Sequence, residues 1–83
     1  MKTKETAVQA YQRNRKDIGA LVGLITQETR RHADFARKDG MNWARVGDLA
    51  EVRRKLLETL AFLAQQDETF IEKRLATMRQ GRR

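Results

Sequence analysis

An apolar residue recurs every three or four positions between residues 49 and 63, and this row constrains the fold more than any other feature of the sequence. It consists of Leu49, Val52, Leu56, Leu60 and Leu63. Residues at these spacings share one face of an α-helix, whereas a half-buried strand would alternate at every second position. The row therefore predicts a long helix whose apolar face needs a partner.

The remainder of the chain also favours helices. Its 83 residues contain no Pro and five Gly, so turn signals are few. Ala, Leu, Glu, Gln, Lys and Arg, which are good helix formers, dominate the composition. A chain of this length forms one small domain in which a single core is barely sufficient. We expect an all-α fold with few, long helices.

The first helix is expected over about residues 4–36, with Thr3 or Thr6 as its N-cap. Its apolar positions approximate a heptad seam; they are Val8, Tyr11, Ile18, Val22 and Ile25. The polar cluster over residues 12–17 interrupts this seam. One continuous helix is the favoured interpretation, and a break with Asp17 capping a new helix is the alternative.

A turn is expected over residues 37–47, because Asp39-Gly40 is a strong local breaker and Gly40 can take a positive φ. Within this turn, Asn42 is expected to cap a short helical segment over residues 43–46, before Gly47 resets the backbone. The lone Trp43 is expected to close the end of the bundle. Asp48 with Glu51 three residues later resembles a capping box, which places the start of the second helix at Asp48.

The second helix is expected over about residues 48–79, followed by a basic tail over residues 80–83. A restart at Asp67 is the alternative to one continuous second helix. Two helices of roughly 30 residues would each be about 45 Å long and would form an antiparallel hairpin.

Leu21 and Leu57 lie beside the main apolar rows of the two helices. Each apolar stripe is therefore wide enough to contact two neighbouring helices. We therefore expect two hairpins to pair into a dimeric four-helix bundle. A three-helix monomer broken near Asp17 is the competing architecture. Gly19 and Gly23 are expected to form a flat spot that another helix approaches closely.

Several kinds of activity are excluded or disfavoured. The chain has no Cys and no Ser, so disulfides, zinc–cysteine sites and Ser or Cys nucleophiles are excluded. No glycine-rich phosphate loop is present. Glu28 and the only histidine, His32, are too few for a metal site in a helical bundle. We expect no enzyme, no cofactor and no metal.

The apolar run over residues 18–25 is too short to span a bilayer, and the N-terminal region lacks the pattern of a signal peptide. A cytoplasmic location is therefore expected.

Lys and Arg outnumber Asp and Glu by 18 to 11, which gives a net charge of +7. In the predicted hairpin, basic residues from both helices would meet at one end and offer phosphate contacts. The candidate nucleic-acid-binding residues are Arg30, Arg31, Arg45, Arg53 and Arg54. The sequence thus favours a homodimeric, non-enzymatic binding or regulatory protein that contacts nucleic acid. The alternative is a protein–protein adaptor whose basic surface serves solubility or an acidic protein partner.

Overall fold

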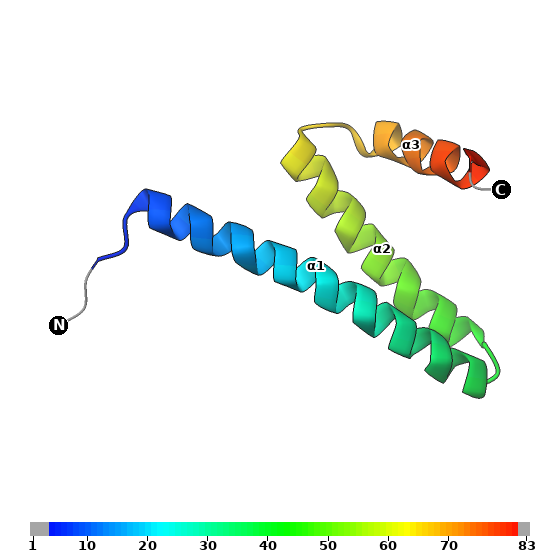
Figure 1. Ribbon diagram of the computed structural model, residues 1–83. Coiled ribbons are helices and arrows are strands. Elements are labelled where there is room, and N and C mark those ends of the chain that lie inside the picture. The colour runs from blue at the N-terminus through cyan, green and yellow to red at the C-terminus, as the bar shows by residue number, and fades with distance from the viewer. Residues whose placement is uncertain (1–3, 82–83) are drawn as a thin grey trace. The chain divides into compact units, whose positions relative to one another are not determined.

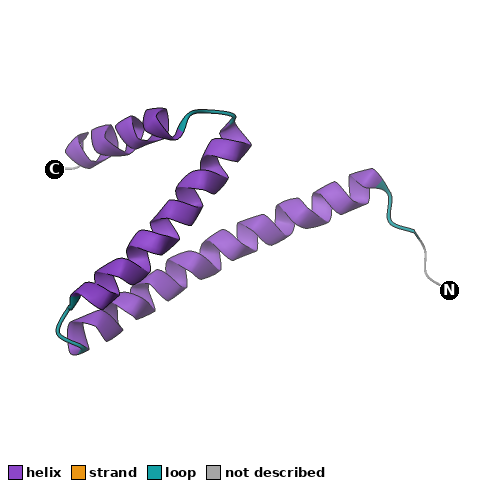
Figure 2. Cartoon of the chain, turned by 180° about the vertical axis from the view of Figure 1, so that it is seen from behind, coloured by secondary structure: helices purple, strands orange, loops and turns teal. Residues whose placement is uncertain are grey.

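The computed structural model describes residues 4–81, and within this range it contains three α-helices and no strand (Figures 1 and 2). The helices are α1 (Ala7–Lys38), α2 (Trp43–Ala64) and α3 (Glu68–Gly81). The predicted all-α class is confirmed. The chain divides into two compact units: residues 1–41 contain α1, and residues 42–83 contain α2 and α3. The hairpin and the dimeric bundle remain predictions.

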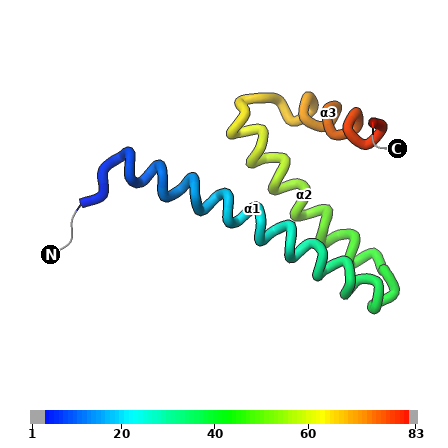
Figure 3. Tube along the Cα trace, in the orientation of Figure 1, coloured from blue at the N-terminus to red at the C-terminus, as the bar shows by residue number. Residues whose placement is uncertain are grey.

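The helix α1 runs without interruption through residues 12–17 (Figure 3). Its N-cap is Thr6, whose Oγ1 accepts a hydrogen bond of 3.1 Å from the amide of Gln9. The Gln9 side chain accepts one of 2.9 Å from the amide of Thr6, which completes a capping box. Residues 4–81 form three helices, as in the alternative architecture, but the additional break lies between α2 and α3 and not near Asp17.

Gly40 ends α1 as predicted, with a left-handed φ of 83°. The amide of Met41 donates to the carbonyl of Ala36 at 2.7 Å, and the amide of Gly40 donates to that of Arg37 at 3.4 Å. These two bonds form a Schellman motif, which satisfies carbonyls that the helix end would otherwise leave open.

The predicted start of the second helix at Asp48 is wrong, because Asn42, the expected cap of a separate short turn, is the N-cap of α2 itself. Asn42 Oδ1 accepts hydrogen bonds from the amides of Ala44, at 3.0 Å, and Arg45, at 3.3 Å. Asp48 lies inside the helix, so there is no capping box with Glu51. Trp43, the first residue of α2, is 83% exposed in the described structure, and its place at the end of a bundle stays a prediction.

The predicted second helix is divided into α2 and α3, and the restart at Asp67 is the alternative that the structure confirms. Gln65 adopts left-handed angles (φ 56°, ψ 48°), and the amide of Gln66 donates to the carbonyl of Ala61 at 3.0 Å. Asp67 Oδ1 then accepts from the amide of Thr69 at 2.8 Å. Of the expected basic tail, Gln80 and Gly81 belong to α3, whereas Arg82 and Arg83 lie outside the described residues.

The second unit has a small core where α2 and α3 contact each other. Ile71 of α3 is only 3% exposed. Leu75 of α3 and Leu57 and Ala61 of α2 are partly covered. The row from Leu49 to Leu63 that predicted this helix stays exposed on α2. The two helices therefore meet through the neighbouring Leu57 side of α2.

Candidate nucleic-acid interface

Arg54 forms ion pairs with two carboxylates of its own helix. Its Nη2 lies 2.8 Å from Glu51 Oε2, and its Nη1 lies 3.0 Å from Glu58 Oε2. These residues are three positions before and four after Arg54, so all share one face of α2. The hydrogen bond from Arg54 lowers the pKa of Glu51, and the same bond raises the pKa of Arg54. The charge of Arg54 is thus balanced within the helix.

Arg53 joins α2 to α3 through a bidentate ion pair with Glu72. Its Nη1 and Nη2 donate to the two carboxylate oxygens at 3.0 and 2.6 Å. Both side chains are about half exposed. The hydrogen bonds lower the pKa of Glu72 and raise the pKa of Arg53. The parallel alignment of two N–H groups with a carboxylate fixes orientation as well as charge, so Arg53 has a structural role.

The other predicted residues differ in their surroundings. Arg31 Nε lies 2.9 Å from Glu28 Oε1, and Arg45 Nη1 lies 3.0 Å from Asp48 Oδ2. Arg30 is exposed and forms no ion pair with a carboxylate of the described residues.

Arg30 and Arg31 belong to the first unit, and the other three predicted arginines belong to the second. All of them except Arg30 are engaged by a carboxylate, so phosphate contacts would compete with existing ion pairs. Their assembly into one patch remains a prediction.

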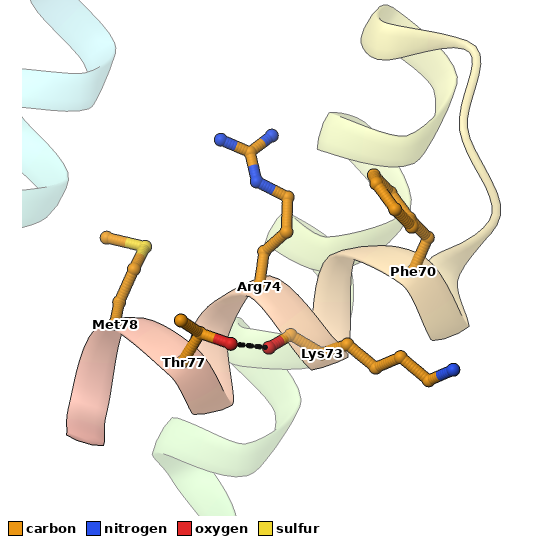
Figure 4. A pocket seen from close by; sticks show the side chains of 5 residues that line it. All are labelled: Phe70, Lys73, Arg74, Thr77 and Met78. Atoms are coloured by element: carbon orange, nitrogen blue, oxygen red, sulfur yellow. Dashed lines mark hydrogen bonds between the residues drawn. The ribbon is translucent and has the colours of Figure 1, made fainter. Parts of the chain in front are cut away.

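Among the described residues, several basic side chains form no ion pair with a described carboxylate. They are Lys4, Arg15, Lys16, Arg30, Lys38, Lys73, Arg74 and Arg79. Two of these, Lys73 and Arg74, line an open groove of about 340 Å³ together with Phe70, Thr77 and Met78 (Figure 4). All five residues belong to α3. This groove was not predicted from the sequence. Its signal is the spacing of three and four residues between its lining residues, with no acidic residue among them.

The described residues 4–81 hold no group of three or more His, Cys, Asp or Glu side chains that could bind a metal ion. Within the same range, no helix combines the length and apolar character needed to cross a membrane. Comparisons of the chain with protein-family models, with curated proteins and with solved structures found no match.

Proposed function

We propose that this chain is a non-enzymatic binding protein that associates with a second copy of itself through the apolar faces of α1 and α2. The observation that carries this proposal is that each of these two helices presents a long apolar row that the described chain leaves exposed.

The apolar row of α1 has no partner within its own unit, because α1 is the only helix there. Its members are between 36% and 68% exposed; they are Val8, Tyr11, Ile18, Val22 and Ile25. Helices in water owe most of their stability to the packing of such a face against other elements. The stability of α1 therefore depends on contacts from outside its unit.

The apolar row of α2 also has no partner within its own unit. The helix α3 covers the side that carries Leu57 and Ala61, while Leu49 to Leu63 remain between 37% and 70% exposed. A helix with two apolar faces, only one of which is covered within its unit, is suited to a bundle in which it has more than one neighbour.

The experiment is a mass measurement by light scattering on Ile18→Asp and Leu56→Asp, with Gln27→Asp as the matched control. Gln27 is exposed on the polar side of α1. A charge within either apolar row is expected to dissociate the oligomer, because it would be buried unpaired, while Gln27→Asp keeps the native mass. The milder Ile18→Ala should raise the dissociation constant without a buried charge. Native masses for all of these variants would contradict the proposal.

Nucleic-acid binding is the second candidate function, and the net charge of +7 together with the unpaired Arg30 favours it. Fluorescence anisotropy of duplex DNA and of structured RNA tests it at low and physiological salt. Binding that persists at physiological salt, prefers one nucleic acid and is lost in Arg30→Glu would support this function. Binding that disappears with salt equally for both is expected of any protein with this charge.

A further inference from the structure

We propose that the exposed groove on α3 is a docking site for an acidic segment of another protein that places two apolar side chains on either side of a carboxylate. The groove is lined by Phe70, Lys73, Arg74, Thr77 and Met78, and we call it the α3 groove. This proposal is independent of self-association, since it uses residues outside the apolar rows of α1 and α2.

The α3 groove has apolar ends and a cationic centre. Phe70 is 49% exposed and Met78 is 59% exposed. Figure 4 shows Arg74 rising from α3 between these two side chains. Phe70 and Met78 are eight positions apart, which is about 12 Å along a helix. Two apolar side chains of a partner about two helical turns apart, or roughly 11 Å, would match this spacing.

The charge of the groove is uncompensated. Lys73 and Arg74 form no ion pair with the described residues, and no acidic residue lines the groove. The nearest acid in sequence, Glu72, is held by Arg53 of α2. The backbone carbonyl of Lys73 is also engaged, because Thr77 Oγ1 donates to it at 3.0 Å (Figure 4). The groove therefore offers two free cationic side chains and attracts a carboxylate.

An arginine between two apolar side chains favours a peptide carboxylate as its ligand. Apolar contacts at Phe70 and Met78 would exclude water from Arg74, and a charge-assisted, bidentate hydrogen bond is stronger where water is excluded. The flexible Met78 side chain can adapt to apolar groups of different shape. Both features are common in grooves that bind amphipathic helices.

Other anionic partners fit the α3 groove less well. A membrane surface needs a continuous apolar face for insertion, but Ile71 is buried and Leu75 partly covered in the second unit, which leaves Phe70 and Met78 for insertion. A nucleic-acid backbone needs a series of cations along a continuous surface, whereas apolar side chains form both ends of this groove.

The test uses a fluorescent peptide of about twelve residues, or three helical turns, with two Leu residues seven positions apart, which is about 11 Å along a helix. The peptide has Glu at positions between the two Leu residues and a net negative charge. Its affinity for the full chain is measured by anisotropy at physiological salt. Arg74→Glu and Phe70→Ala are the test variants. Lys16→Glu is the control, because it makes the same change of charge on exposed α1. Circular dichroism verifies that all variants keep their helicity.

We expect saturable binding that Arg74→Glu and Phe70→Ala each weaken by about tenfold or more, and that Lys16→Glu leaves within about twofold. Three results would overturn the proposal: no saturable binding up to a peptide concentration of about 1 mM, an equal loss in Lys16→Glu, or tighter binding of single-stranded RNA or anionic vesicles with the same dependence on Arg74.

Discussion

Arg53 of α2 and Glu72 of α3 form two parallel hydrogen bonds, of 3.0 and 2.6 Å, across the boundary between their helices. Together with the buried Ile71, this pair connects α3 to α2 in a unit that has little other core. The short helix α3 has 14 residues, a length at which an isolated helix is marginal in water. Its order therefore depends on these contacts.

The ion pair makes the docking of α3 dependent on pH. The hydrogen bonds from Arg53 lower the pKa of Glu72, with a smaller attraction from Arg79. A carboxylate whose pKa is lower in the folded state stabilises that state above its ordinary pKa of about 4.3 and loses the effect as pH falls through the lowered value. The rate of amide hydrogen exchange in α3, corrected for its intrinsic pH dependence, should be constant between neutral pH and about pH 5. Below about pH 4 the corrected rate should rise. In Glu72→Gln this change should disappear; an unaltered pH response in that variant would assign it to another group.

Ile71→Ala should release α3 from α2. Removing a buried isoleucine side chain costs about 2 kcal/mol or more, because Ile71 is 3% exposed. Phe62→Ala is the control, since Phe62 is 84% exposed and its loss should change stability by about 0.5 kcal/mol or less. Urea unfolding followed by circular dichroism, with amide exchange for α3, measures both. Similar effects of the two substitutions would show that Ile71 is not part of a core.

Gln65→Gly should stabilise the second unit, because Gln65 holds left-handed angles that glycine adopts without a steric cost. The expected gain is about 1 kcal/mol, and Gln65→Val should lose at least as much. Thermal unfolding of the three chains provides the comparison. If Gln65→Val were as stable as the native chain, α2 and α3 would not be separated by this left-handed residue.

Gly23→Ala separates two interpretations of the glycines in α1. A Cβ added at Gly23 meets no atom within 4 Å in the described structure. The substitution should therefore raise the stability of α1 by about 1 kcal/mol, which helical content by circular dichroism reports. If another helix approaches closely at Gly19 and Gly23, as expected from the sequence, Gly23→Ala would instead reduce association, and the measured mass would fall.

The sequence predicted the helical class, two candidate caps of which Thr6 is the one that the structure uses, and the stop at Gly40, since each depends on local chemistry. It placed the start of α2 incorrectly because Asn42 and Asp48 are both good N-caps, and the spacing of apolar residues continues equally well from either. The sequence does not decide whether the helix breaks after Ala64, because the apolar spacing from Leu63 to Phe70 is compatible with one helix. In the structure, the Asp67 side chain caps the start of a separate helix.

Less of the candidate site than of the fold could be predicted from the sequence. The i to i+4 spacing of Arg54 and Glu58 is typical of an ion pair on one helix face, and the structure has one. The ion pair between Arg53 and Glu72 joins residues 19 positions apart, so no local sequence pattern indicates it. Which arginines form an ion pair depends in part on such long-range partners, and the sequence alone does not supply them. The groove with Lys73 and Arg74, by contrast, follows from spacings within α3.

The central claim is that the apolar rows of α1 and α2 bring two copies of the chain together. Sedimentation equilibrium of the native chain over a wide range of concentrations tests this most directly. We expect a species with twice the chain mass of 9.7 kDa, which dissociates only on strong dilution. A mass of 9.7 kDa at every concentration, with full helicity, would contradict it.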